Sequence, residues 1–209
     1  MRRLSTVFVL VLLPFFLSAQ MKYSGFDGGM MLHTGYVQGK QITTTDQSGQ
    51  PLQTITPKGA PFGIGGMAKV HLGKHLRIGA EGYVSNLKYG VKGTFSALGW
   101  GGLLADCMWE RGKFTPFIGG TIGGGGYKNM ILENNYGDDY VVEDHVSFRH
   151  YGLMLITPFV GFEYALTNKV HLSLKLDYII PVAGRQEDFV TGPRIYFGFM
   201  FHRSKTQEE

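Results

Sequence analysis

The sequence predicts an all-β fold, an eight-stranded antiparallel up-and-down transmembrane β-barrel. Three observations support this prediction. No stretch after Gln20 approaches the ~18 consecutive apolar residues of a membrane-spanning helix, although 44% of the residues are hydrophobic, 13% are aromatic and 31 are glycine. Eight segments alternate between apolar and polar residues, as strands with two different faces do. The connections between these segments alternate between short and longer, which is typical of barrels that span a membrane.

The first 19 residues predict a secretory signal peptide. Arg2 and Arg3 precede the apolar run Val7–Leu17, and Ser18-Ala19 supplies small residues for cleavage. A transmembrane anchor is the alternative, but this apolar run is short for a span. We therefore expect a signal peptide over 1–19, a barrel over 20–203 and a polar C-terminal tail over 204–209.

Charge and cysteine content narrow the class of protein further. The formal net charge is +4 and the sequence pI is about 9.1, but the basic residues are scattered and the chain carries an export signal, so no nucleic-acid partner is expected. Cys107 is the sole cysteine, which excludes an intrachain disulfide. A closed, hydrogen-bonded barrel in lipid is an alternative source of stability.

The first four strands are expected over residues 25–39, 62–72, 76–87 and 93–109. In 62–72, Phe62 and Ile64 share an apolar face, and Lys69 and His71 occupy the opposite face. The fourth strand is less regular because Leu103 and Leu104 are adjacent. For this strand we expect Asp106 and Met108 to point inward. We expect the outward-pointing residues to be Leu103, Ala105, Cys107 and Trp109.

The last four strands are expected over residues 113–128, 149–166, 170–179 and 194–202. The third of these alternates most cleanly. In 113–128, Phe117 and Ile118 are adjacent and glycines occupy both faces, so the sequence leaves its lipid-facing side open. Such frequent glycines favour a strand that its neighbours approach closely.

The connections predict the orientation of the barrel. Residues 40–61 and 129–148 are long polar loops, 88–92 and 183–190 are moderate, and 73–75, 110–113 and 167–169 are short turns. Outer-membrane barrels have short periplasmic turns and longer extracellular loops. Both termini are therefore expected on the periplasmic side.

The face opposite the apolar one carries acids and bases. An eight-stranded barrel is filled by side chains, so these groups should form a packed ion-pair network, with a narrow pore as the alternative. The charged residues expected inside are Lys69, Arg77, Glu81, Glu163, Lys175, Asp177 and Arg194.

Three segments carry a family resemblance over essentially the whole mature chain. KFTPFIGGTIGGGGYK, ALTNKVHLSLKLDYII and RIYFGFMF resemble the glycine strand, the turn-and-strand unit and the aromatic closing strand of OmpA/OmpX-type eight-strand barrels, including PorT-like proteins. The resemblance implies a location in the bacterial outer membrane, with the bilayer and lipopolysaccharide as surroundings. The PorT-like part implies an accessory barrel of a secretion or assembly complex, with other envelope proteins as partners. One departure is that His202–Glu209 follow Phe201, where the family usually ends the chain on an aromatic residue.

We propose no catalytic, cofactor-binding or metal-binding residues from the sequence, and no cofactor. His171-x-Ser173 resembles the pair used by outer-membrane lipid A deacylases, but no Asn follows Ser173 and the pair points away from lipid. Gly119-Gly120 and Gly123–Gly126 lack the Lys-Ser/Thr of a phosphate loop.

A second group of charged residues could bind a divalent ion. Asp138, Asp139, Glu143, Asp144 and His145 match no calcium-loop spacing and favour a solvated acidic loop. The sequence therefore predicts a non-enzymatic barrel with a structural or interaction role through residues 40–61 and 129–148.

Overall fold

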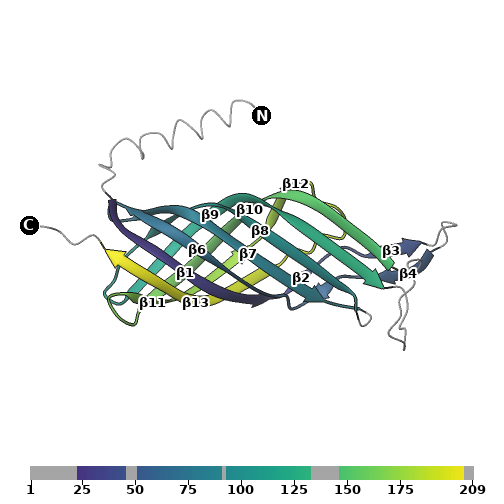
Figure 1. The fold of residues 1–209 in the computed structure, drawn as a ribbon, viewed down its shortest axis with the longest axis horizontal. Helices are drawn as coiled ribbons and strands as arrows, with labels where there is room; N and C mark the ends of the chain where they lie inside the picture. The colour runs from purple at the N-terminus through teal and green to yellow at the C-terminus, as the bar shows by residue number, and fades with distance from the viewer. Residues whose placement is uncertain (1–22, 46–50, 91–92, 133–145, 205–209) are drawn as a thin grey trace, which may run out of the picture.

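The computed structural model describes residues 23–45, 51–90, 93–132 and 146–204, which form a closed antiparallel barrel (Figure 1). No helix among these residues is long and apolar enough to span a bilayer. The eight walls of the barrel are β1 (Tyr23–Gly35), β6 (Phe62–Leu72), β7 (Leu76–Lys88), β8 (Phe95–Met108), β9 (Phe114–Leu132), β10 (Val146–Ala165), β11 (Val170–Tyr178) continued by β12 (Ile180–Ala183), and β13 (Pro193–Ser204). The predicted fold class is confirmed.

The barrel closes between its first and last strands. β1 pairs with β13 from Gly25↔Ser204 to Gly35↔Arg194, and every other barrel strand pairs with the strands next to it in the sequence. The start of β1 and the end of β13 therefore lie at the same end of the barrel (Figure 1). The short turns at 73–75, 109–113 and 166–169 lie at this end too, which we call the terminal end; the longer connections lie at the opposite, loop end.

The outer surface is apolar along all eight strands of the barrel. Leu103, Ile122 and Phe201 are 76%, 64% and 64% exposed, whereas Leu104 and Phe117 are buried inside. The expected faces of 93–109 are thus confirmed, and Ile118 rather than Phe117 faces outward on β9. The sequence left β9 open because its glycines carry no side chain that marks a face.

The inward glycines of β9 allow it to pack closely against β8. Gly119 and Gly125 lie directly opposite Asp106 and Trp100 in the register. A Cβ atom on Gly123 would lie 2.0 Å from the backbone oxygen of Gly101, a distance that no side chain tolerates. These glycines therefore have a packing role, and the phosphate-loop reading is not supported.

The loop end is more structured than the sequence predicts. Within the segment expected as a polar loop over 40–61, β3 (Ile42–Thr45) pairs with β4 (Pro51–Ile55), and β5 (Lys58–Gly59) pairs with β2 (Val37–Gln38). The sequence predicted a long polar loop there without these strands, although threonine and isoleucine favour strands. β9 and β10 likewise extend to Leu132 and Val146, so the second loop is shorter than expected.

Candidate functional site

The barrel interior contains all the charged side chains that the sequence placed there. All seven of those residues are buried: Lys69, Arg77, Glu81, Glu163, Lys175, Asp177 and Arg194. Strand alternation turns them inward, and the narrow eight-stranded cross-section brings them into contact. Six of them form two layers of ion pairs, one towards the terminal end and one nearer the middle, whereas Arg194 makes no ion pair within the described residues.

The layer towards the terminal end is centred on Arg77. Its Nε donates to Asp106 Oδ1 at 2.6 Å, and its Nη1 donates to Glu163 Oε1 at 2.9 Å. Lys69 Nζ donates to the same Glu163 oxygen at 2.8 Å and lies 5.0 Å from the centre of the Phe117 ring. Two cations and two carboxylates thus neutralise each other across β6, β7, β8 and β10.

The middle layer is centred on Lys175. Its Nζ donates to Glu81 Oε2 at 2.6 Å and lies 3.7 Å from Asp177 Oδ2. Four aromatic rings surround the same ammonium group at 4.3 to 6.0 Å from their centres, namely Tyr83, Trp100, Phe159 and Tyr196. A desolvated ammonium in such surroundings combines ion pairing with cation–π attraction. The predicted ion-pair network is therefore present among the described residues.

At the loop end, the connection that follows β12 folds into the barrel. Asp188 and Phe189 are fully buried, with Asp188 accepting hydrogen bonds from Asn129 Nδ2 at 3.0 Å and from the Tyr151 hydroxyl at 3.0 Å. The Phe189 ring packs 5.2 Å from the ring of Tyr127. The sequence indicated a polar loop over 183–190, and its inward fold was not anticipated because Asp-Phe-Val carries no pattern of its own.

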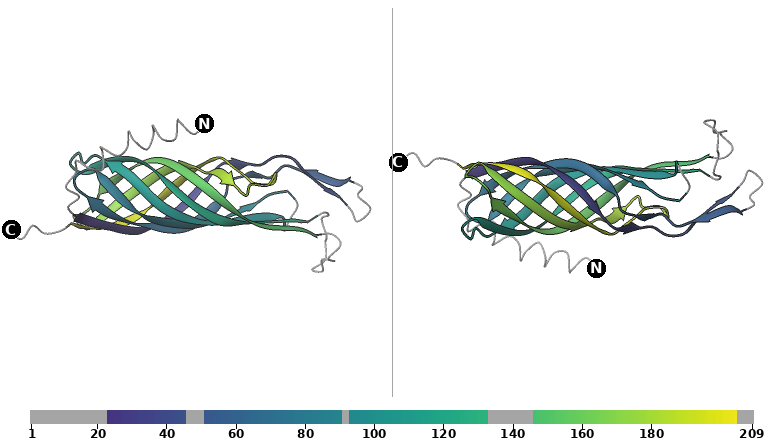
Figure 2. Two further views of the ribbon diagram at one scale, coloured as in Figure 1. Left: turned by 90° about the horizontal axis from the view of Figure 1, so that it is seen from above. Right: turned by 90° about the horizontal axis from the view of Figure 1, so that it is seen from below.

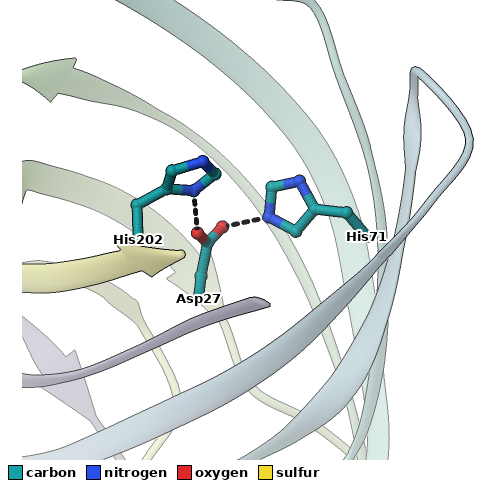
Figure 3. Close-up of side chains that lie close together, drawn as sticks. All are labelled: Asp27, His71 and His202. Carbon is teal, nitrogen blue, oxygen red and sulfur yellow. Dashed lines mark hydrogen bonds and ion pairs between the residues drawn. The ribbon is translucent and has the colours of Figure 1, made fainter. Parts of the chain in front are cut away.

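At the terminal end, Asp27, His71 and His202 converge from β1, β6 and β13 (Figure 3). Asp27 Oδ2 accepts a hydrogen bond from His71 Nε2 at 2.5 Å, and Asp27 Oδ1 accepts one from His202 Nδ1 at 2.5 Å. Asp27 and His71 are buried and His202 is half-buried. Sequence reasoning did not single out this cluster. Its signal was the shared inward face of three residues near the terminal end of their strands.

The pair His171 and Ser173 does not form an activated nucleophile. The Ser173 hydroxyl is fully buried and has no hydrogen-bond partner among the described residues. The His171 ring stacks on His202 at 4.9 Å, and its Nδ1 lies 3.9 Å from Glu163 Oε2. A serine nucleophile needs a base within hydrogen-bond reach, so the geometry does not favour hydrolysis here. The acidic residues Asp138–His145 lie outside the described residues.

Comparison with solved structures identifies the type of barrel. Neisserial surface protein A (NspA) matches with a TM-score of 0.53 at 15% identity, over 85% of this chain and 96% of NspA. The chain is similar in fold to NspA. Ail, the attachment invasion locus protein of Yersinia pestis, solved with the heparin analogue sucrose octasulfate, gives 0.45 at 11% identity, over 84% of this chain and 99% of Ail.

The N-terminal β-barrel domain of Pseudomonas aeruginosa OprF gives a TM-score of 0.42 at 13% identity, over 86% of this chain and 99% of that domain. No protein-family model matches the chain, and no curated protein matches it. The chain therefore shares its fold alone with NspA.

Proposed function

We propose that the protein is an integral outer-membrane β-barrel with a structural or interaction role through its loop end. The observation that carries this proposal is a continuous apolar outer surface around a closed barrel whose elaborated connections all lie at one end. A soluble barrel would need a polar outer surface, because exposed apolar patches of this extent mark contact with lipid or protein. An export signal over residues 1–19 remains part of the proposal.

The outward side chains are apolar, and those near the strand ends include the aromatic residues expected at a membrane interface. Trp109 and Tyr164 are exposed at the terminal end of their strands, and Tyr178 is exposed at the end of β11. Aromatic residues of this kind are enriched where a membrane protein meets the lipid headgroups. In a bacterial outer membrane the surrounding molecules would include lipopolysaccharide.

The loop end is the surface available to a partner. The β3–β4 hairpin projects beyond the barrel wall, as both views in Figure 2 show. Tyr36 and Phe148 are 54% and 58% exposed at this end, and Thr43 and Thr54 lie on the exposed face of the hairpin. Aromatic side chains such as these are enriched in protein-contact surfaces.

The packed interior argues against a pore. Arg77, Tyr127, Tyr196 and Lys69 are among the largest fully buried side chains, and Phe189, in the connection after β12, is fully buried as well. Ion passage requires a hydrated path, which these side chains occupy. The accessory role in a secretion or assembly complex remains a narrower version of the interaction proposal.

Site-directed labelling tests both the orientation and the surface. In a Cys107→Ser background, Thr43→Cys is placed in the projecting hairpin and Lys74→Cys in the short turn after β6. A membrane-impermeant maleimide added to intact cells should label the first variant and leave the second unlabelled until the cells are lysed. Labelling of Lys74→Cys alone in intact cells would refute the orientation.

Crosslinking then tests the interaction role. A photoactivatable residue at position 43 should capture a specific envelope protein or lipopolysaccharide in intact cells, and the same residue at position 74 should not capture that partner. Identification of a secretion component by mass spectrometry would favour the accessory-barrel version. Absence of any position-specific product at 43 would count against an interaction role for the hairpin.

A further inference from the structure

We propose that Asp27, His71 and His202 bind one divalent transition-metal ion of the Zn²⁺ type at the terminal end of the barrel. Two imidazoles and one carboxylate form a donor set that suits zinc and its first-row neighbours rather than magnesium or calcium. This site is independent of the interaction role proposed for the loop end.

The three side chains are already close enough to share an ion. Their ligand atoms all lie within 4.8 Å of one another, and Asp27 bridges the two imidazoles through its two oxygens (Figure 3). In a tetrahedral zinc site with metal–ligand distances of ~2.1 Å, neighbouring ligand atoms are ~3.4 Å apart. Small side-chain rotations therefore suffice, and the ion would take the place of the two hydrogen-bonded protons.

The barrel holds the cluster in position. Asp27 lies directly opposite His202 in the β1–β13 register and directly opposite Lys69 in the β1–β6 register, and His71 is two residues beyond Lys69 on the same face. The ring of His202 stacks on His171, with an interplanar angle of 12°. Sites on paired strands with packed neighbours keep their geometry better than sites on loops.

The local charge can accommodate a cation. Among the described buried residues there are six carboxylates but four lysine and arginine side chains. Arg77 Nη1 lies 3.3 Å from Asp27 Oδ2, but it donates at shorter distance to Glu163, and Lys69 also pairs with Glu163. Arg77 therefore also donates to Asp27. Lys69 and Arg77 are two cations beside three carboxylates, Asp27, Asp106 and Glu163, so this layer keeps one net negative charge that a metal ion would compensate.

An ion can reach the cluster from the terminal end. A cavity of about 430 Å³ is lined by His71 and His202 together with Ser24, Lys74, His75 and Glu110, among others. Three protein ligands leave a fourth coordination position, and this polar cavity offers room for a water molecule there. In the proposed orientation the cavity opens towards the periplasm.

Binding would stabilise the pairing of β1 with β13 that closes the barrel. The three ligands come from β1, β6 and β13, so the ion links the first strand of the barrel, β1, to both strands that pair with it, β13 and β6. Because the unfolded chain cannot preassemble these ligands, an ion bound by the folded barrel stabilises that barrel.

The test uses the mature chain refolded in detergent without a polyhistidine tag. After equilibration with Zn²⁺ and dialysis, elemental mass spectrometry should find one ion per chain, and titration calorimetry gives the affinity. Asp27→Asn, His71→Gln and His202→Gln should each weaken Zn²⁺ binding by more than about tenfold. His75→Gln is the matched control, because His75 lines the same cavity but bonds the Met108 carbonyl, and it should retain the affinity.

Two further measurements keep the proposal open to refutation if a variant does not fold. In the wild-type protein, Zn²⁺ should protect His71 and His202, but not His75, from diethylpyrocarbonate modification detected by mass spectrometry. Co²⁺ should give the intense visible absorption of a tetrahedral site. Absence of stoichiometric binding or absence of this protection would overturn the assignment. It would also be overturned if binding were lost in His145→Gln, in the acidic segment Asp138–His145, and kept in His71→Gln.

Discussion

Replacing Lys175 by methionine tests whether the middle layer of the interior stabilises the barrel. Methionine keeps much of the side-chain volume and removes the ammonium group. Lys175 is fully buried, donates to Glu81 at 2.6 Å and lies 3.7 Å from Asp177. The substitution leaves both carboxylates inside the barrel without this cation.

The expected loss of stability is large because the remaining charges stay buried. Removal of one partner from a buried ion pair destabilises a protein by about 3–5 kcal/mol. The ammonium group also lies 4.3 Å from the centre of the Tyr196 ring, so its cation–π attraction disappears too. We therefore expect Lys175→Met to lower the free energy of unfolding by about 3–5 kcal/mol.

Urea unfolding of the barrel in lipid vesicles, followed by tryptophan fluorescence, measures this loss. The Trp100 ring lies 6.0 Å from Lys175 Nζ and reports directly on the layer. Lys169→Met in an exposed turn is the matched control and should change the stability by less than about 0.5 kcal/mol. Adding Glu81→Gln to Lys175→Met should recover at least about 1 kcal/mol, because one uncompensated carboxylate is then removed.

Two results would refute this reasoning. A loss below about 1 kcal/mol in Lys175→Met would mean that water or rearranged side chains compensate the carboxylates. A double variant that is less stable than Lys175→Met alone would mean that Glu81 is not stabilised by Lys175.

Three other predictions have equally definite expected outcomes. Gly123→Ala should destabilise the barrel by about 1–3 kcal/mol, because its Cβ would meet the Gly101 backbone, whereas Gly126→Ala should be tolerated; heat-dependent gel mobility and urea unfolding measure both. Ser173→Ala should leave the acylation of lipid A unchanged by mass spectrometry, and a change would revive the hydrolase alternative. Burial raises the pKa of the Tyr89 phenol, in the connection after β7, to about 12. Since the unfolded phenol ionises near pH ~10, stability should fall as the pH rises from there towards the folded pKa, and Tyr89→Phe should show a smaller alkaline loss in pH-dependent unfolding.

The sequence predicts the strands of this barrel well because apolar and polar side chains alternate along them. The expected strand 62–72 coincides with β6, and Leu103 and Asp106 face the expected sides. Prediction is weaker where side chains carry no facing information. The glycines of β9 are the main example, since only their contacts with β8 show which of them point inward.

The candidate metal site could not be predicted from the sequence because its ligands are distant along the chain. Asp27 is 44 residues from His71 and 175 residues from His202, and only the strand register brings them together. Alternation places each of the three on the inner face, but it does not say at what height each lies. The inward-folded Asp188 is similar, since its partners come from β9 and β10.

The long sequence separation of the interior ion pairs has a consequence for how the barrel is made. Lys69 finds Glu163, and Glu81 finds Lys175, each 94 residues further along the chain. Insertion into lipid one hairpin at a time would therefore leave the charges of β6 and β7 in an apolar medium before their partners arrive, which is energetically unfavourable. Insertion should instead be cooperative, with the late strands brought alongside the early ones before the barrel enters the bilayer.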